Sequence, residues 1–579
     1  MNLNLKTAPD APNAINRYDA IVVGSGISGG WAAKELTEKG LRVLMLERGK
    51  HVEHVTDYAG SMNNPWDDPL RNAISTGTHD RQPIQSGVYA YNNETKHLWV
   101  DDLDSPYNQV KPYNWFRGNQ LGGRSLMWGR QSYRFSAMDF EANARDGFGT
   151  DWPVRYVEMA RWYDYVETFA GISGSLEKLP QLPDGKFLPP MDMYCLEKTM
   201  KGAIEKNWSD RKMIIGRTAN LTQAQRIHTS VGRASCQFRN KCHWGCPYGG
   251  YFSTQSATLP AAKATGKLSV VTDAIVTEVL YDDKKNRATG VRIQDRNTGA
   301  VREYYARIVF VNASTLGTTG LLLNSTSSRF PNGLGNDSGV VGKYLMDHHY
   351  GVWFTGEYEG LKDEYYYGRR ANGIYIPRFR NLPGQKQRTD YVRGFGYQGE
   401  ASRAGWQRGG SLPGFGAGLK EELSEPGNWQ MRLGSWAEQL PDAKNTVTLN
   451  RQKLDKWGMP TLDVNASFGP NEMAMRKDML ASGIEMMEAS GLKNVQGVDA
   501  LDVTPPGSCI HEMGTCRMGR DPKTSALNGF NQMHAVKNVF VTDGSFMASS
   551  ACQNPSLTYM AFTARAADYA VKEMKKGNI

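Results

Sequence analysis

The hydrophobic pattern near the N-terminus predicts a strand, a glycine-rich turn and a helix in immediate succession. Residues 18–23 (YDAIVV) form a short apolar, β-branched run that is typical of a buried parallel strand. The turn GSGISG follows, and residues 30–39 then carry good helix formers. A second apolar run at 41–46 (LRVLML) ends at Glu47. This order predicts the start of a dinucleotide-binding β-α-β unit.

The residues of this unit have separate physical reasons to be there. Gly24 permits the tight turn, Gly26 lets the backbone approach a pyrophosphate, and Gly29 lets the helix pack close to the strand. The helix N-terminus faces the phosphate charge. Glu47 lies 21 residues after Gly26, where a carboxylate can bind the adenosine ribose hydroxyls. An isolated motif of this kind is more often an ordinary turn, and the unit does not distinguish NAD from FAD.

Two later runs alternate aromatic with polar positions, YGVWFTGEYEG at 350–360 and YYYGRRANGIYIPRF at 365–379. Such alternation predicts antiparallel strands. The glycine-rich stretch at 409–418 (GGSLPGFGAG) is expected to be a loop at the rim of a pocket. Because 579 residues are too many for one ordinary core, we expect two interleaved lobes.

Composition and charge exclude several classes of protein. Hydrophobic residues make up 40% of the chain and charged residues 22%, as in ordinary globular proteins. No apolar run approaches the roughly 20 residues of a membrane span. The net charge of +9 is spread among 59 acidic residues, so the sequence predicts no nucleic-acid binding. Residues 1–16 (MNLNLKTAPDAPNAIN) do not resemble a secretory signal, so we expect any export to depend on a partner.

Six blocks together resemble the glucose-methanol-choline (GMC) family of FAD-dependent oxidoreductases. They are RGNQLGGRS (117–125), ASTLGTTGLLLNS (313–325), VGKYLMDHH (341–349), HEMGTCRMG (511–519), NVFVTDGSFM (538–547) and NPSLTYMAFTARAADY (554–569). The resemblance implies an α/β (α+β) fold in which a Rossmann-like FAD-binding domain is interleaved with a substrate domain on an antiparallel sheet, as in p-hydroxybenzoate hydroxylase. We place the FAD-binding domain in 15–60, 115–165, 225–345 and 500–579, the substrate domain in 166–224 and 346–499, and an excursion or lid in 61–114.

The resemblance also implies the residues that contact the flavin. Gly122 and Gly123 would let the backbone pass close to a flat ring, and Asp543 would meet phosphate or ribityl hydroxyls. The further expected cofactor contacts are Arg48, Ser125, Val276, Gly544, Asn554 and Thr558. The GG…W…RF pattern is most similar to pyranose oxidases, but Met127 stands in the stretch where they carry a flavin-linked histidine. We therefore expect non-covalent FAD.

Alcohol oxidation by a flavin requires a base that takes the hydroxyl proton as hydride leaves for flavin N5, and histidine suits that role at neutral pH. His511 stands at the position of the family's catalytic histidine. Asn554 stands at the position of its second histidine or asparagine, and an amide there can stabilise the developing alkoxide. His348, His349 and His534 are expected to be structural.

Three cysteines, Cys236, Cys242 and Cys246, lie within eleven residues. Their spacing is not that of a zinc ribbon, and iron-sulfur clusters are held by cysteines on short loops. The resemblance to cluster-bearing sugar dehydrogenases of the GMC family implies a three-iron, four-sulfur (3Fe-4S) cluster. Structural zinc completed by His243 or by a remote residue, and simple free thiols, remain alternatives. The other cysteines, 195, 509, 516 and 552, are expected to be packing residues.

These observations predict an FAD-dependent sugar dehydrogenase, with carbon 3 of glucosides or disaccharides as the preferred position. Electrons would leave through the cluster to a cytochrome or other carrier. Oxidation at the anomeric carbon or of polyols and aldonates, an oxygen-using sugar oxidase, and a non-redox relative like the hydroxynitrile lyases are the alternatives. Relatives of this kind often have a small companion subunit with an export signal, so we expect either a periplasmic enzyme exported with a partner or a cytoplasmic one.

Overall fold

Seven strands form the sheet that carries the glycine turn, in the order β5-β2-β1-β8-β7-β6 with β18 paired to β8. This computed structural model describes residues 16–64, 66–68, 72–366 and 370–579, so the N-terminal stretch 1–15 and residues 367–369 of the second aromatic run lie outside it. The parallel strands are β1 (Arg17–Val23), β2 (Val43–Leu46), β5 (Leu268–Val271), β8 (Val301–Val311) and β18 (Val539–Val541). The antiparallel pair β6 (Ala274–Asp282) and β7 (Arg287–Asp295) extends the sheet.

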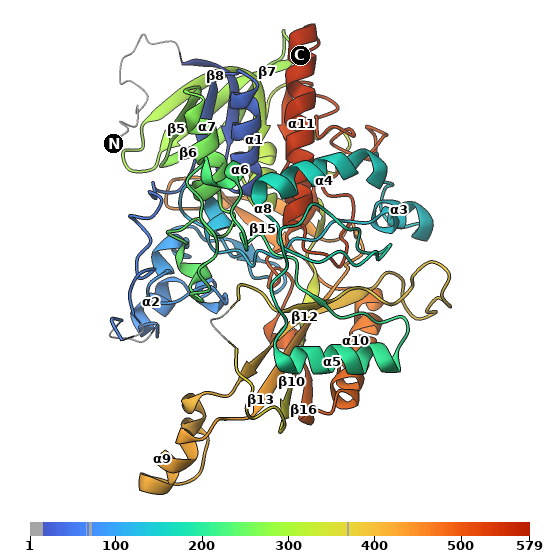
Figure 1. Cartoon of the computed structure of the whole chain (residues 1–579). Helices are drawn as coiled ribbons and strands as arrows, with labels where there is room; N and C mark the ends of the chain where they lie inside the picture. The colour runs from blue at the N-terminus through green and yellow to red at the C-terminus, as the bar shows by residue number, and fades with distance from the viewer. Residues whose placement is uncertain (1–15, 65, 69–71, 367–369) are drawn as a thin grey trace.

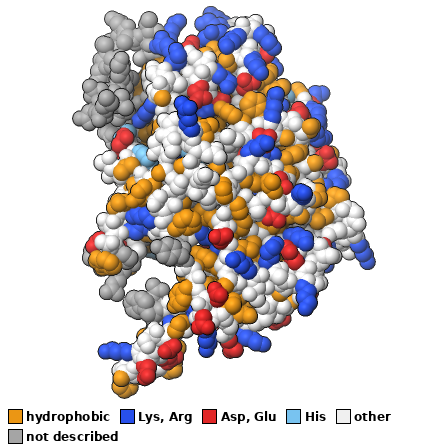
Figure 2. Space-filling model, in the orientation of Figure 1, with side chains coloured by type: hydrophobic (Ala, Val, Ile, Leu, Met, Phe, Trp, Pro, Cys, Tyr) orange, Lys and Arg blue, Asp and Glu red, His pale blue; other side chains and the backbone are white. Residues whose placement is uncertain are grey.

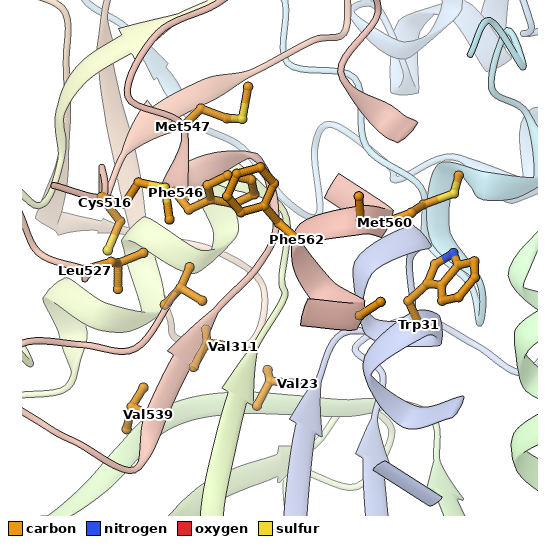
Figure 3. Close-up of a cluster of buried hydrophobic side chains, with 14 of the residues drawn as sticks. Val23, Trp31, Val311, Cys516, Leu527, Val539, Phe546, Met547, Met560 and Phe562 are labelled. Carbon is orange, nitrogen blue, oxygen red and sulfur yellow. The ribbon is translucent and has the colours of Figure 1, made fainter. Parts of the chain in front are cut away.

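The first and the last helix of the described chain pack together on one face of this sheet. Helix α1 (Ile27–Glu38) packs against the C-terminal helix α11 (Ser556–Lys576), and α4 (Tyr156–Ala170) packs against α11. Figure 1 shows the blue α1 beside the red α11. Their apolar side chains share one core with residues of β1, β8 and β18, as the cluster around Trp31, Val311 and Phe562 shows (Figure 3). The discontinuous segments therefore form one lobe because each covers apolar surface of the others.

The second lobe is a six-stranded antiparallel sheet in the order β16-β10-β13-β12-β11-β4. Its strands are β4 (Ile214–Ile215), β10 (His349–Tyr358), β11 (Ile374–Ile376), β12 (Phe395–Arg403), β13 (Trp429–Ala437) and β16 (Lys493–Asp499). Helices α5 (Cys195–Asn207) and α10 (Pro470–Ala489) pack on it (Figure 1). The mixed α/β, two-lobed fold predicted from the sequence is confirmed. The exact domain boundaries stay predictions, although all strands of the two larger sheets fall in the expected segments.

A third sheet joins the lobes and brings two of the sequence blocks together. Its order is β17-β9-β14-β15-β3, with β3 (Asn108–Gln109), β9 (Lys343–Met346), β14 (Thr446–Leu454), β15 (Pro460–Asn465) and β17 (Met513–Thr515). Met513 of β17 is paired with Met346 of β9. The histidines after β9 and the histidine before β17 are thereby placed next to each other. The remaining α-helices are α2 (Thr76–Arg81), α3 (Ala137–Asp146), α6 (Arg226–Thr229), α7 (Leu259–Ala264), α8 (Thr315–Asn324) and α9 (Gly416–Ser424).

No residue of the glycine-rich stretch 409–418 lines the large cavity between the lobes, whose rim it was expected to form. The stretch leads into α9, which projects from the second lobe between β12 and β13 (Figure 1). No residue of α9 is buried, and Phe415 before it is 93% exposed.

Across the described part of the chain, no helix combines the length and apolar character needed to cross a bilayer. Acidic and basic side chains are interspersed over the face seen in Figure 2, as expected for a solvated surface.

Candidate active site

A cavity of about 950 Å³ lies between the carboxyl ends of the parallel strands and the antiparallel sheet. This is the upper end of the usual range for small-molecule sites, about 300–1,000 Å³. Ligands of open α/β sheets bind at this end of the strands. On one side the cavity is lined by the residues that follow β1, β2, β8 and β18: 24–28, 47–48, 312–315 and 543–544. On the other side it is lined by side chains of β10, β12 and β13.

The glycine turn has the geometry that its sequence predicts. Gly24 has a φ of +88°, and an added Cβ would lie 2.2 Å from the carbonyl oxygen of Asn312. At Gly29 an added Cβ would lie 1.9 Å from the carbonyl oxygen of Gly24, so the helix can approach the strand only with glycine there. Around Gly26 nothing lies within 4 Å of the corresponding position. Gly24 and Gly26 line the cavity, whereas Gly29 supports the turn from behind.

Glu47 is held at the end of β2 by the turn itself. Its carboxylate accepts hydrogen bonds from the backbone N–H of Ser25 at 3.1 Å and of Gly49 at 2.8 Å, and burial raises its pKa. The Ser25 hydroxyl also donates to Glu47 and accepts from the N–H of Gly122 at 2.8 Å, which ties the turn to the 117–125 block. Arg48, also on the wall, forms an ion pair with Asp455 at 2.6 Å.

Most of the other expected cofactor contacts line the cavity as well. They are Gly123, Ser125, Val276, Asp543, Gly544 and Asn554. The Ser125 hydroxyl donates to the carbonyl of Gly122 at 2.6 Å, and Gly122 itself stands behind the wall. Thr558 also lies outside the lining: it is fully buried and shares a hydrogen bond of 2.8 Å with Tyr163. We therefore assign a supporting position to Gly29, Gly122 and Thr558.

Three helices begin at the cavity wall. Residues at the N-termini of α1, α8 and α11 line it, namely Ile27, Thr315 and Ser556. Helix N-termini carry partial positive charge and unpaired N–H groups. The side-chain amide nitrogen of Asn312, also on the wall, is buried without a hydrogen-bond partner. The cavity therefore fits an elongated ligand with anionic groups, such as a flavin dinucleotide.

The two predicted catalytic residues lie together at the junction of the lobes. Nε2 of His511 lies 3.3 Å from Nδ2 of Asn554, and both side chains line the cavity. Oδ1 of Asn554 accepts a hydrogen bond of 2.6 Å from Gln398 on β12. Gln398 thus fixes the amide so that its nitrogen faces the histidine and the cavity.

A second histidine determines which nitrogen of His511 is basic. Nε2 of His348 contacts the carbonyl oxygen of Ala551, which can only accept, so this nitrogen carries the proton. Nδ1 of His348 therefore accepts from Nδ1 of His511, 2.7 Å away. The free lone pair of His511 is then on Nε2, facing Asn554. Contrary to the sequence-based expectation, His348 is part of the site; it acts as a positioning residue.

Asp347 organises the loop around this pair. Its carboxylate accepts hydrogen bonds from the backbone N–H groups of His348 (2.9 Å), Gly507 (2.9 Å), Cys509 (3.1 Å) and His511 (3.0 Å). Burial raises the pKa of Asp347 to about 7, and the backbone donors oppose this shift. Cys509 is buried as predicted, but it also lines the cavity, and its Sγ lies 3.2 Å from Nδ1 of His511.

Arg124 and Glu512 form a bidentate ion pair beside the candidate base. The two guanidinium nitrogens lie 3.0 and 2.7 Å from the two carboxylate oxygens, and both residues line the cavity. The positive charge of Arg124 contributes to the lowered pKa of His511.

The protonation state of His511 leads to a prediction about pH. Burial, together with His348 and Arg124, holds the pKa of His511 well below its usual value. A base with a lowered pKa stays unprotonated as the pH falls through about 6.5, the ordinary histidine value. Anaerobic flavin reduction by substrate, followed by stopped flow, should therefore be independent of pH from about 8 to 6.5. A rate that falls as the pH is lowered from 8 to 6.5 would contradict the lowered pKa of His511.

The three-cysteine loop borders the same cavity. Cys242 begins a short 3-10 helix, Cys242–Trp244, and the next residue, His243, lines the cavity wall. Burial raises the pKa of Cys236 to about 11, and Cys242 and Cys246 add to the shift. The thiols are thus close enough to interact, yet among the described residues only His348, Cys509 and His511 bring three candidate ligand atoms within 4.8 Å of one another. The three Sγ atoms of the loop therefore do not lie close enough together to coordinate one metal ion.

Family models described as GMC oxidoreductase match residues 18–350 and 441–563. This chain belongs to the GMC oxidoreductase family. Family membership implies FAD as the cofactor and oxidoreductase activity on alcohol groups.

This GMC oxidoreductase is similar to two named dehydrogenases over nearly its whole length. It is 29% identical to the 2-methyl-1,2-propanediol dehydrogenase of Mycolicibacterium austroafricanum, across 96% of this chain and 95% of that protein. It is 25% identical to the fructose dehydrogenase large subunit of Gluconobacter japonicus, across 96% and 98%. The crystal structure of pyridoxine 4-oxidase from Mesorbium loti matches with a TM-score of 0.60 at 15% identity, across 95% and 98%, and shows the same fold.

Proposed function

We propose that this GMC oxidoreductase oxidises a ring hydroxyl of a sugar, with carbon 3 of glucosides or disaccharides as the preferred position and the 3-keto sugar as the product. One observation carries the proposal: the wall opposite the strand ends combines aromatic and polar side chains. Trp353 and Trp436 lie there with Gln398, Glu400 and Arg432. Stacking faces and hydrogen-bonding groups together suit a polyhydroxylated ring.

The roles of the residues follow from the geometry at His511. Nε2 of His511 takes the hydroxyl proton, and Nδ2 of Asn554 donates a hydrogen bond to the substrate oxygen as negative charge develops on it. FAD, when bound non-covalently, supplies the acceptor for the hydride. Gln398 holds the amide and His348 holds the imidazole, so both partners are oriented before the substrate arrives.

Similarity to a fructose dehydrogenase supports the sugar class. A small branched diol, as in the name of the other dehydrogenase, is the second candidate. The charged and amide side chains of β12 and β13 favour the sugar, because a compact diol presents few groups for them to bind. Oxidation at the anomeric carbon, of polyols or aldonates, and transfer of electrons to oxygen remain outcomes of the test.

We further propose that the loop 236–246 holds a 3Fe-4S cluster as the electron exit. Thiolates are soft ligands that suit iron-sulfur clusters, and a cluster of several iron atoms holds its ligands farther apart than a single ion does. Cys246 accepts a backbone hydrogen bond from Gly250 at 3.3 Å, a type of contact that stabilises thiolate sulfur. His243 places this loop at the cavity wall, and the cluster would supply a one-electron carrier there.

The relative named as a large subunit supports the proposal of a companion subunit for this chain. A cytochrome or another carrier would receive the electrons. We propose export to the periplasm together with that subunit, with a cytoplasmic enzyme as the alternative.

The proposal is tested by an anaerobic screen in which flavin bleaching is recorded and the product carbon is identified by NMR. We expect glucosides and disaccharides to bleach the flavin and to give 3-keto products. Iron and acid-labile sulfide should be present beside the flavin. Fructose and 2-methyl-1,2-propanediol serve as comparison substrates. Bleaching by the diol but by no sugar would contradict the substrate class, and a protein that released hydrogen peroxide and contained zinc would contradict the electron route.

A further inference from the structure

Arg233 is a buried cation with no acidic partner, three residues before the first cysteine of the loop. It is 2% exposed, and no carboxylate oxygen of the described residues lies within ion-pair distance of it. Two other buried arginines have acidic partners: Arg217 pairs with Asp184 at 2.7 Å, and Arg134 pairs with Glu167. Because an uncompensated buried charge is costly, an arginine without such a partner calls for an anion nearby.

The contacts of Arg233 hold its guanidinium group in place but do not neutralise it. Nε donates to the carbonyl of Gly249 at 2.9 Å, and Nη1 donates to the carbonyl of Ala170 at 2.8 Å. Nη2 is buried and has no hydrogen-bond partner. The guanidinium group of Arg233 therefore has one N–H donor without a partner and a positive charge without a carboxylate beside it.

Hydrogen bonds connect Arg233 to the turn that follows Cys246. The N–H of Gly249 donates to the carbonyl of Cys246 at 2.9 Å, and the carbonyl of Gly249 accepts from Nε of Arg233 at 2.9 Å. The N–H of the next residue, Gly250, donates to Sγ of Cys246 at 3.3 Å. Two adjacent residues of this turn therefore contact the guanidinium group and the cysteine sulfur.

A second unpaired arginine lies on the cavity side of the loop. Arg130 is 3% exposed, and it donates to the carbonyls of Trp128 at 2.5 Å and Ala371 at 3.2 Å. Its Nε is buried without a partner, and no acidic group of the described chain pairs with it. Its guanidinium lies 5.5 Å from the ring centre of Tyr251, in the segment that follows Cys246.

We propose that Arg233 is the buried counter-cation of an anionic group held by the loop 236–246, and that Arg130 adds positive charge from the cavity side. The inference rests on the proposed cluster, because three thiolates around an iron-sulfur core carry net negative charge. A buried cation beside such a group favours its more negative, reduced form. Arg233 would therefore help the loop retain its cluster and raise the cluster's reduction potential.

The test compares the full-length protein with Arg233→Met, Arg233→Gln and Arg233→Lys. Iron and sulfide per flavin are measured, and the midpoint potential of the cluster is obtained from a redox titration followed by EPR. The two neutral variants should lose iron or show a potential shifted to lower values, whereas the lysine variant should remain close to the wild type. Arg217→Met is the matched control: it removes an equally buried arginine that has its own carboxylate, and it should change neither quantity. Unchanged iron content and potential in both neutral variants would overturn the inference.

The same measurements separate a failure of this inference from a failure of the proposed function. A wild-type protein without iron would contradict the proposed cluster and, with it, this role of Arg233. A wild-type protein that contains iron, with unchanged iron content and potential in both neutral variants, would contradict the role of Arg233 alone.

Discussion

Replacement of His511 by alanine is expected to slow anaerobic flavin reduction by about a hundredfold to ten-thousandfold at neutral pH, the usual contribution of a positioned general base. The reason is geometric: Nε2 of His511 is the unprotonated nitrogen beside Asn554 at the cavity. The change removes the proton acceptor without touching the glycine turn. Flavin content should therefore remain at the wild-type level, and stopped-flow bleaching at saturating sugar measures the effect.

Two further histidine variants serve as controls for this result. His348→Leu keeps the base but removes the acceptor that fixes its tautomer, so the rate should fall by less than in His511→Ala. His534→Ala removes a histidine that contacts Ser525 and lies outside the cavity lining, and it should leave the rate unchanged. If His511→Ala bleached as fast as the wild type, another group would have to be the base.

Replacement of Cys242 by serine should separate the two halves of the reaction. Bleaching of the flavin by sugar should persist, because the cavity residues around His511 are untouched. Electron transfer to an acceptor too large to enter the cavity, such as a cytochrome, should fall by roughly tenfold or more if the loop holds the proposed cluster and the variant loses it. The two rates and the iron content are measured on the same preparation.

Cys195→Ser is the matched control, because Cys195 lies at the start of α5 on the second lobe and outside the loop. It should alter neither rate nor iron content. Loss of bleaching itself in Cys242→Ser would show that the loop supports the cavity structurally rather than carrying electrons.

Local patterns predicted the first lobe well, because its signals are contained in short segments. The run 18–23, the glycine turn and the strand before Glu47 each specify their own conformation. The helix covers Ile27–Glu38 rather than 30–39, and the second strand covers Val43–Leu46 rather than 41–46. The second aromatic run was less regular than its alternation indicated. Only Ile374–Ile376 of its described residues form a strand, which ends before Pro377, a residue with no N–H to donate.

The candidate site was only partly predictable, because its missing members depend on pairing between distant segments. His511 and Asn554 stand in recognisable blocks, but His348 reaches His511 through the pairing of β9 with β17. Gln398 belongs to a strand that has no motif of its own. Alternation along β12 shows that its residues point to two faces, but it cannot show which face meets the cavity. No sequence pattern indicated the role of Arg233, because the absence of an acidic partner can be recognised only in the folded structure.

The packing of β18 and α11 against elements near the N-terminus determines when the cavity can be completed during synthesis. Strand β18 completes the sheet beside β8, and α11 packs along α1, so the wall around Gly26 is finished by residues after position 538. A ribosome that has translated the first 500 codons has made neither Asp543 nor Asn554. The nucleotide cavity is therefore completed only after residue 554 has been made, and until β18 is in place β8 exposes an edge at which nascent chains can associate wrongly.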